Sequence, residues 1–271
     1  MTQSVDVTAI TERQKETWGA AGYQSIANQV VDVAEALLEA VAPGPTQRVL
    51  DVACGTGNAA LGAARRACDV VGVDYVPAMI ERARARAEAD GLPVRFEVGD
   101  AQALPYSEAE FDTVLSVFGS MFAPDQERTA SELLRVCKPG GVVGLVTWPP
   151  HGYAKDFLEV HAKYMPPPPE LDSPFRWGTE AGLEELLGDR VSSIESTYRT
   201  TRFYGRSVED LAREYRRDFG PTVRTFASLP DEKHQELFQD MVDVLERHNR
   251  ATDGTAVVEA EYVLAIAVRH P

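Results

Sequence analysis

Cysteine is scarce in this sequence of 271 residues, and its distribution excludes a fold held by disulfides or zinc. The three cysteines, Cys54, Cys68 and Cys137, are odd in number, widely spaced and without a C-x-x-C pair. Neither a disulfide framework nor a structural zinc site is expected from that pattern. The five histidines show no metal-ligand spacing either, so we predict no metal.

Long apolar runs are missing as well. No stretch is long enough to span a membrane, and the polar, mixed-charge residues 1–11 do not resemble a secretory signal. We therefore expect a cytoplasmic protein with no membrane partner. With 44% hydrophobic and 25% charged residues, the composition is that of an ordinary globular chain that can bury a core.

Basic residues are in the minority. The 27 Lys and Arg residues face 42 Asp and Glu residues, which gives a formal net charge of −15. A surface of that sign repels a phosphate backbone unless a local basic groove compensates. The densest basic stretch, Arg82, Arg84 and Arg86, is interpreted as the solvated face of a helix. Nucleic acid is therefore not expected as a partner.

Short apolar runs that alternate with helical patterns fill the first half of the chain. A helical pattern covers residues 11–41 and ends at Pro43-Gly44-Pro45. Strands are then predicted at 48–53, 70–74, 94–98, 111–117 and 142–148, and helices at 58–67, 77–89 and 124–137. This alternation is typical of βαβ units and a parallel sheet.

After Pro149 the pattern changes. Four consecutive prolines in residues 165–170 predict a stiff, extended connector. Helices are predicted at 179–187, 207–218 and 230–249, and strands at 191–204 and 261–269. The second half thus adds two strands and a group of helices to the sheet.

A glycine loop carries a ligand-binding signature, V49-L-D-V-A-C-G-T-G-N-A-A60. A strand runs into Gly55-x-Gly57, and a helix follows. Glycines allow a tight turn and a close approach of ligand to backbone, and the helix N-terminus adds backbone donors. Alone the motif is unspecific, because Gly55-x-Gly57-x-x-Ala60 also matches the dinucleotide fingerprint.

Asp51 helps to separate the two interpretations. It lies just before the loop, where its carboxylate would face a bound pyrophosphate. Two such charges ~4 Å apart repel by roughly 1 to 4 kcal/mol across plausible dielectrics. S-adenosylmethionine carries an ammonium and a sulfonium and no phosphate, so its cationic end would favour Asp51. A role for Asp51 as a helix cap stays open.

Two more acidic residues follow later strands. Asp74, in G72-V-D-Y75, lies at about the offset at which an acid meets ribose hydroxyls. Asp100, in G99-D-A-Q102, is placed to accept from the adenine amine, while the Ala101 amide could donate to the ring. Acidic residues are also common in turns after strands, which leaves a structural role open for both.

Together these segments resemble the class I S-adenosylmethionine-dependent methyltransferases, in the group related to ubiquinone and menaquinone C-methyltransferases. The matching stretches are LDVACGTG, GVDYVPAMIERAR, GDAQALPYSEAEFDTVLSVFGSMFAPD and ELLRVCKPGGVVGLVTW, in order over about residues 48–148. The resemblance implies an α/β fold, a Rossmann-like doubly wound seven-stranded sheet with the last strand antiparallel, and a helical cap.

The resemblance also implies roles for single residues. Asp51, Gly55 and Gly57 would hold the methionine end of S-adenosylmethionine, Asp74 the ribose and Asp100 the adenine. The other predicted contacts flank or cover the nucleoside. The full predicted cofactor set is Tyr23, Asp51, Ala53, Gly55, Gly57, Asp74, Tyr75, Met79, Asp100, Ala101, Gln102 and Ser116.

Three regions follow from this assignment. Residues 1–45 form a helical segment that covers the cofactor site, and residues 46–150 form the cofactor-binding core. Residues 151–271 form the acceptor-binding region, with a helical cap at 207–249 and the final strands. We expect the cap to close over the acceptor as a lid.

The methyl acceptor is expected beyond the carboxyl ends of the strands, near residues 116–122 and 148–153. S116-V-F-G-S-M-F122 lacks the Asn/Asp-Pro-Pro-aromatic motif of many amino-methylating nucleic-acid enzymes, so a small-molecule acceptor is predicted. His151 is the candidate general base, because histidine titrates near neutrality; an exposed loop histidine fits equally well.

Several alternatives stay open from the sequence. They include a nicotinamide-dependent oxidoreductase and a non-catalytic S-adenosylmethionine-binding protein. The sequence does not identify the acceptor or the methylated atom, and it leaves a homodimer open.

Overall fold

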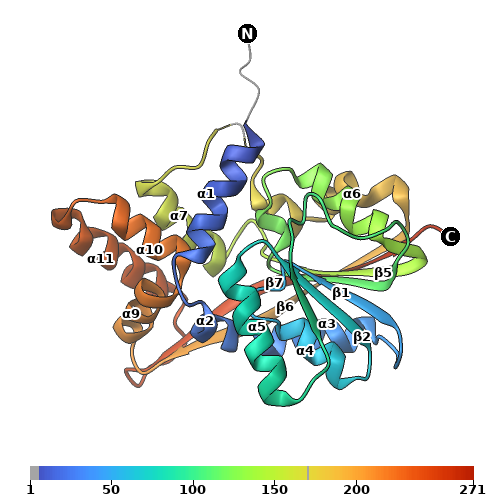
Figure 1. Cartoon of the computed structure of the whole chain (residues 1–271). Coiled ribbons are helices and arrows are strands. Elements are labelled where there is room, and N and C mark those ends of the chain that lie inside the picture. The colour runs from blue at the N-terminus through green and yellow to red at the C-terminus, as the bar shows by residue number, and fades with distance from the viewer. Residues whose placement is uncertain (1–5, 170) are drawn as a thin grey trace, which may run out of the picture.

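The protein is seen in a computed structural model that describes residues 6–169 and 171–271. Residues 1–5 of the predicted N-terminal segment, and residue 170 at the end of the predicted proline connector, lie outside the described residues. A single seven-stranded sheet runs through the molecule, with helices on both faces and a group of helices at one end (Figure 1).

The sheet has the predicted doubly wound topology. Its strands lie in the order β3-β2-β1-β4-β5-β7-β6. Strands β1 to β5 pair in parallel, and β7 is antiparallel to both β5 and β6. The α/β, Rossmann-like fold with an antiparallel last strand is thus confirmed. The strands are β1 (Arg48–Val52), β2 (Asp69–Asp74), β3 (Arg95–Val98), β4 (Phe111–Val117), β5 (Cys137–Thr147), β6 (Val191–Gly205) and β7 (Ala256–Arg269).

The strand order reverses at β1, which pairs with β2 on one side and β4 on the other. Val49, Leu50 and Val52 of β1 are fully buried, as expected of a strand covered on both faces. In open α/β sheets, ligands bind beyond the carboxyl ends of the strands where the order reverses. The fold therefore predicts a ligand site at the end of β1, where the glycine loop begins.

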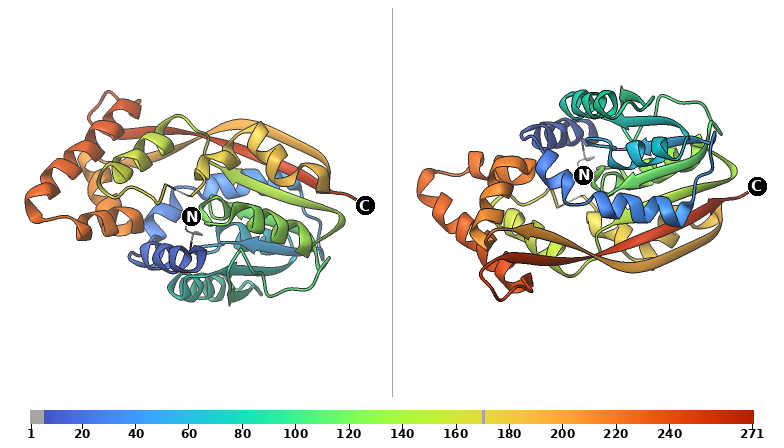
Figure 2. Two further views of the ribbon diagram at one scale, coloured as in Figure 1. Left: turned by 90° about the horizontal axis from the view of Figure 1, so that it is seen from above. Right: turned by 90° about the horizontal axis from the view of Figure 1, so that it is seen from below.

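Two helical layers cover the sheet (Figures 1 and 2). Helices α3 (Val31–Val41), α4 (Asn58–Arg65) and α5 (Pro77–Asp90) lie on one face, and α6 (Gln126–Val136) and α8 (Glu180–Leu187) on the other. Small residues allow α3 and α4 to pack closely: a Cβ built on Gly62 would lie 2.5 Å from Leu38 Cδ1. Short 3-10 turns occur at Ser120–Phe122, Pro174–Gly178 and Gly188–Arg190.

The remaining helices gather at one end of the molecule (Figure 1). Helix α11 packs against α7 and α9, and α10 packs against α1. The region predicted as a cap, 207–249, consists of α9, α10 and α11, and the sequence analysis did not predict α7, which joins them. These helices are α1 (Val7–Gly19), α2 (Gln24–Asn28), α7 (Tyr153–Tyr164), α9 (Val208–Asp218), α10 (Gly220–Ser228) and α11 (Asp231–His248).

The single helix predicted at 11–41 is wrong, because this stretch holds three helices. Helix α1 ends at Gly19, and α2 begins after Tyr23, whose φ of 56° is left-handed. The break lets α2 turn back over the end of the sheet. There Asn58, at the start of α4, donates its side-chain amide to the Ala27 carbonyl at 2.7 Å.

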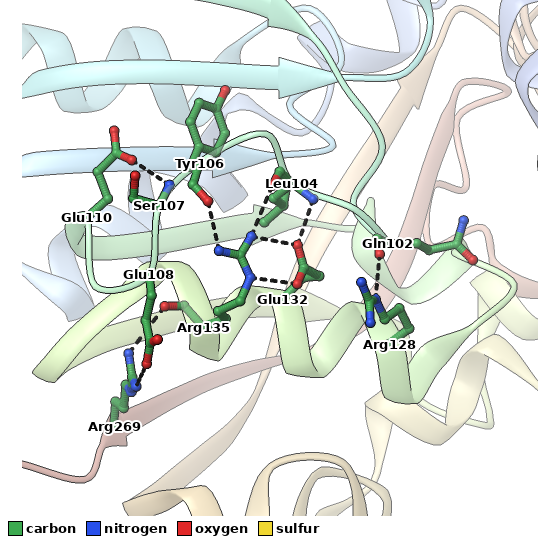
Figure 3. Close-up of polar contacts among 10 residues, drawn as sticks. All are labelled: Gln102, Leu104, Tyr106, Ser107, Glu108, Glu110, Arg128, Glu132, Arg135 and Arg269. Atoms are coloured by element: carbon green, nitrogen blue, oxygen red, sulfur yellow. Dashed lines mark hydrogen bonds and ion pairs between the residues drawn. The ribbon is translucent and has the colours of Figure 1, made fainter.

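Hydrogen bonds and an ion pair attach the chain between β3 and β4 to α6 (Figure 3). The Leu104 amide donates to Glu132 at 2.7 Å, and Arg135 pairs with the same carboxylate at 2.7 Å. The hydrogen bonds from Arg135 hold the pKa of Glu132 below its ordinary value. Arg128 donates to the Gln102 carbonyl at 3.0 Å, so the segment after β3 is anchored to the core.

Within residues 6–169 and 171–271, no helix is both long and apolar enough to cross a membrane. Across those same ranges, no group of three His, Cys, Asp or Glu side chains is arranged to hold a metal ion. The three cysteines are free thiols.

Candidate functional site

A cavity opens at the carboxyl ends of β1, β2 and β4, beneath the terminal helices. Its empty space is about 1460 Å³, counting the open mouth. One part of its wall carries acidic residues from the strand ends, and another part carries aromatic residues from α1, α7, α9 and β6. The two parts belong to one continuous cavity, so a polar ligand and an apolar ligand can meet in it.

Asp51, at the end of β1, is buried in the wall of the polar part. One of its carboxylate oxygens accepts from the Ala60 amide at 2.9 Å, which ties it to the first turn of α4. Burial raises the pKa of Asp51 to about 7; the Ala60 hydrogen bond opposes the shift and the charge of Asp74 adds to it. Asp51 therefore caps the first turn of α4 and also lines the cavity.

Asp74, at the end of β2, is the second buried carboxylate. Its two oxygens accept from the Gly55 amide at 2.9 Å and the Val76 amide at 2.8 Å. Burial raises its pKa to about 6, against the effect of these two hydrogen bonds. Each carboxylate oxygen keeps a second lone pair, so the group can still accept hydrogen bonds from a ligand.

Asp100 follows β3 and lines the same cavity. Gln102 donates to it through its backbone amide at 2.9 Å and its side-chain amide at 3.1 Å. The Gln102 side chain also donates to Thr11 of α1 at 3.0 Å. Asp100 is thereby held in place, and the N-terminal helix is tied to this side of the cavity.

The two glycines of the loop differ in what their missing side chains would meet. Gly55 has a φ of +54°, and a Cβ built on it would have nothing within 4 Å. Gly57 has a φ of +88°, and its Cβ would lie 2.8 Å from the Phe96 ring. Gly55 lines the cavity and Gly57 does not. The missing side chain of Gly57 thus makes room for the Phe96 ring of β3. The missing side chain of Gly55 leaves space in the cavity itself.

The other predicted cofactor residues fall into two groups. Tyr23, Ala53, Tyr75, Met79 and Ala101 line the cavity. Burial, followed by the charge of Asp74, raises the pKa of Tyr23 to about 12, so Tyr23 is a neutral donor near neutral pH.

Ser116 and His151 do not line the cavity. The Ser116 hydroxyl donates to the Val52 carbonyl at 2.8 Å and accepts from the Ser120 amide at 3.0 Å, so it closes the base of a loop. His151 is exposed on the surface, where its Nε2 lies 2.6 Å from Glu261. This arrangement explains His151 as a surface residue, and we do not retain it as the base.

The basic stretch on α5 departs from its expected role. Arg82 and Arg84 are exposed, as expected of a solvated face. Arg86 instead reaches the glycine loop, where its guanidinium donates to the Thr56 carbonyl at 2.6 Å and to the Asn58 side chain at 2.9 Å. Arg86 therefore positions the loop, which its place in a charge run did not reveal.

Aromatic rings make up the second part of the cavity wall. Phe118 and Trp148, at the ends of β4 and β5, stack with their ring centroids 3.7 Å apart. Across the cavity, Phe157 of α7 lies 4.7 Å from Tyr215 of α9, centroid to centroid. Tyr153 precedes Phe157 by one helical turn, and their ring centroids are 5.5 Å apart. These rings lie on or next to four elements, β4, β5, α7 and α9.

The cavity wall carries acidic side chains that no basic lining side chain neutralises in the described part of the chain. No Lys, Arg or His is found among the described residues that line the cavity. Arg213 and Arg217 pair with Asp210 and Asp218 instead. The site can therefore receive a cationic group at its carboxylates and an apolar group at its rings.

Comparison with known proteins agrees with this geometry. The family model described as a methyltransferase domain matches residues 49–141. The uncharacterized protein Rv1405c of Mycobacterium tuberculosis is 35% identical over 263 residues, which cover 92% of this chain and 92% of that protein. The demethylmenaquinone methyltransferase of Deinococcus radiodurans is 45% identical over 117 residues, 42% of this chain and 48% of that protein.

A solved structure shares the fold. The phosphoethanolamine N-methyltransferase 2 of Haemonchus contortus, in complex with S-adenosyl-L-methionine, superposes with a TM-score of 0.56 at 21% identity. The match covers 89% of this chain and 53% of that one. The donor set here fits the same cofactor, because carboxylates suit an ammonium and ribose hydroxyls, whereas a pyrophosphate would meet two buried acids.

The topology, the acidic loop at the reversal of strand order and these relatives lead to one family. The nicotinamide-dependent alternative is set aside with them. The chain belongs to the class I S-adenosylmethionine-dependent methyltransferases, in the group related to the quinone methyltransferases, and S-adenosylmethionine is its cofactor.

Proposed function

We propose that this enzyme methylates a small, apolar aromatic acceptor that lies against the aromatic part of the cavity. The observation that carries the proposal is the composition of that wall: rings from Phe118, Trp148, Phe157 and Phe219, and no basic lining side chain among the described residues. Aromatic rings favour stacked or edge-on contacts with another ring. An anionic acceptor would find acidic residues and no cation, so its binding is disfavoured.

For the cofactor, we propose that Asp51 receives the ammonium, Asp74 the ribose hydroxyls and Asp100 the adenine amine. The support is their shared position on one cavity wall at the ends of β1, β2 and β3. Gly55 leaves room for the methionine chain, since a Cβ there would stand in open space.

The remaining predicted contacts extend this arrangement. We propose that Tyr75 and Met79 flank the nucleoside and that Tyr23 covers it. The backbone at Ala53, Ala101 and Gln102 completes the wall around the cofactor. Residues 6–45 form the cover, and α7 with the cap of α9 to α11 forms the acceptor side.

Methyl transfer needs alignment more than acid–base help. The sulfonium is already an activated leaving group, and when bound it supplies the methyl carbon. Asp51, Asp74 and Asp100 would hold the cofactor, which would supply its methyl group to the acceptor in exchange for the acceptor's proton. Orientation of this kind can account for ~7 to 11 kcal/mol of the barrier in favourable cases. In this chain, the rings of Phe157 and Trp148 would hold the acceptor plane and exclude water.

The relatives suggest one acceptor class to try first. The Deinococcus radiodurans relative is a demethylmenaquinone methyltransferase, and reduced naphthoquinones have the flat apolar shape that the aromatic wall favours. A second class comes from the Haemonchus contortus neighbour, a phosphoethanolamine N-methyltransferase. The lack of a basic lining residue argues against a phosphate ester here.

A binding experiment decides between these classes. Protein loaded with S-adenosylhomocysteine is titrated with 1,4-naphthohydroquinone under anaerobic conditions and, separately, with phosphoethanolamine. We expect binding of the naphthohydroquinone alone. Binding of phosphoethanolamine alone would refute the aromatic acceptor.

Matched variants locate the bound acceptor. Phe157 is buried in the cavity wall, whereas Phe238 is half-buried on α11 outside it. Phe157→Ala should weaken naphthohydroquinone binding by about tenfold or more and leave S-adenosylhomocysteine within twofold, since it removes a ring contact. Phe238→Ala makes the same chemical change elsewhere and should leave both affinities unchanged.

A further inference from the structure

The sheet ends in a long strand that has a neighbouring strand on one side only. β6 is 15 residues long and stands last in the strand order, and β7 is its one partner in the part of the chain that the structure describes (Figure 2). An edge strand presents a row of backbone amides and carbonyls with which another strand can pair. The outer edge of β6 is therefore a candidate surface for a second chain.

The even-numbered residues of β6 direct their backbone groups toward this outer edge. Tyr204 lies opposite Val257 of β7, but the Val257 amide and carbonyl bond to residues 249–250 instead. The Tyr204 amide points away from β7 and donates to the Gln29 side chain at 2.6 Å. Backbone direction alternates along a strand. The outward-facing residues that precede Tyr204 are thus Ile194, Ser196, Tyr198, Thr200 and Arg202.

Two charged side chains of β6 are left to pair across this edge. Glu195 and Arg199 are exposed and lie on the same face of the strand. Neither takes part in an ion pair within residues 6–169 and 171–271, whereas Arg202 pairs with Glu259 of β7. Burial raises the pKa of Tyr262, and the charge and a hydrogen bond of Arg199 oppose that shift. A guanidinium has five N–H donors, so Arg199 can bind a further carboxylate.

The spacing of these two charges makes the strand complementary to a second copy of itself. Antiparallel pairing about a two-fold axis at Thr197 places Glu195 of each copy opposite Arg199 of the other. This pair is one that exchanges no backbone hydrogen bonds, and in such pairs the side chains approach most closely. Charges on an edge strand usually prevent pairing. Here they occur twice across the axis with opposite signs, so they favour it.

The backbone and the charges agree on this one register. With the axis at Thr197, outward-facing residues meet outward-facing residues, as Ser196 meets Tyr198, and they can exchange hydrogen bonds. Moving the axis by one residue in either direction still satisfies the backbone, but it brings no opposite charges together. Moving it by two residues places Glu195 opposite Glu195 or Arg199 opposite Arg199, which is unfavourable.

We propose that two copies of this chain pair through the outer edges of β6, antiparallel about Thr197, so that their sheets join into one. Tyr198, whose side chain is 51% exposed in the single chain, then lies in the interface. Neither Tyr198 nor the two charged residues line the cavity, so the pairing does not depend on the identity of the methyl acceptor.

Sedimentation over a series of protein concentrations tests the pairing and its charges. The wild type should pass from monomer to dimer as its concentration rises. Arg199→Glu places a second carboxylate opposite Glu195 and should raise the dimer dissociation constant about tenfold or more. Arg206→Glu makes the same change at an exposed residue just beyond the strand. It is the matched control and should retain the wild-type dissociation constant.

Reversal of both charges separates a specific pair from a general effect of charge. Glu195→Arg alone should weaken the dimer as Arg199→Glu does. The protein that carries both substitutions has its two charges exchanged, so it should regain the wild-type dissociation constant. Circular dichroism of each variant establishes that it is folded.

A disulfide locates the axis without altering any charge. Thr197→Cys places the two introduced thiols on residues whose Cα atoms lie about 4.5 Å apart in such a pair, within the range that a disulfide spans. Mild oxidation should give a covalent dimer on a non-reducing gel. Thr200→Cys places its two thiols far apart on either side of the axis, and it should give no more covalent dimer than the wild type.

The outcomes decide for or against the proposal. A wild type that remains monomeric at every concentration overturns it, as does a dimer that folded Arg199→Glu leaves intact. Failure of the doubly substituted protein to regain pairing while it is folded also overturns it. If a charge variant does not fold, the Thr197→Cys disulfide decides: its formation supports the pairing, and its absence refutes it.

Discussion

Replacing Asp51 by Asn should make the empty protein more stable while it weakens cofactor binding. Asp51 is 1% exposed, and its pKa is raised from 3.8 to about 7. Its carboxylate accepts a hydrogen bond from the Ala60 amide, which an Asn side-chain oxygen can also accept. The substitution therefore keeps the helix cap and removes only a charge that the fold must desolvate.

The size of the effect follows from linkage. The unfolded chain releases the Asp51 proton near pH 4, whereas the folded chain keeps it until about pH 7. The contribution of Asp51 to the stability of the fold is thus most favourable below pH 4 and is lost as the pH rises toward 7. About three pKa units at 1.36 kcal/mol each give up to ~4 kcal/mol by pH 8. Asn has no such proton, so the variant should gain that amount over the wild type between pH 4 and 8.

Chemical denaturation of the two proteins without cofactor, from pH 4 to 8, measures this difference directly. Titrating groups that do not act on Asp51 cancel in the comparison, whereas Asp74, whose charge adds to the raised pKa of Asp51, contributes to the difference. An unchanged difference across the pH range, or a less stable variant at pH 8, would refute the assigned burial cost.

Cofactor affinity should change in the opposite direction. Loss of a buried charge partner costs at least ~2 kcal/mol, or about 30-fold in the dissociation constant of S-adenosylhomocysteine at pH 8. Below pH 7 the wild-type affinity should fall by up to about tenfold per pH unit, because the protonated carboxyl cannot pair with an ammonium. Calorimetry at pH 6 and 8 checks both. Variant affinity equal to that of the wild type would exclude Asp51 from the cofactor site.

Four further substitutions test the loop and its supports. Gly55→Val should abolish S-adenosylhomocysteine binding, since its side chain fills the cavity, whereas Gly57→Ala should mainly lower the denaturation midpoint through its contact with a buried ring. Arg86→Gln removes charged donors to the loop and should weaken S-adenosylhomocysteine about tenfold, as titration will show. Arg135→Ala leaves the buried carboxylate of Glu132 unpaired. It should cost ~3 kcal/mol in chemical denaturation with cofactor affinity unchanged.

The strands and the acidic part of the site were the most predictable features of the sequence. Strands buried on both faces are nearly continuous apolar runs, so β1, β2 and β4 fell within a residue or two of their predicted bounds. Asp51, Asp74 and Asp100 each follow such a strand. Parallel strands end at the same edge of a sheet, which is why three residues distant in sequence meet in one cavity.

The aromatic rings of the cavity wall meet only through tertiary packing. They come from α7, α9 and β6, so the contacts between them depend on how these elements pack. A local signal for α7 did exist: Phe157, His161 and Tyr164 recur at spacings of four and three, as on one face of a helix. The direction of a missing side chain, which separates Gly55 from Gly57, cannot be seen in a motif either.

The cavity concentrates features that disfavour the empty protein. Tyr23, Ala53 and Phe118 have positive φ angles and all line it, and such backbone typically costs of order 1 to 3 kcal/mol per residue. Asp51 and Asp74 add desolvated charge there. A cationic cofactor offsets the second cost but not the first. Stabilisation by S-adenosylhomocysteine should therefore depend strongly on pH, whereas the backbone cost should not.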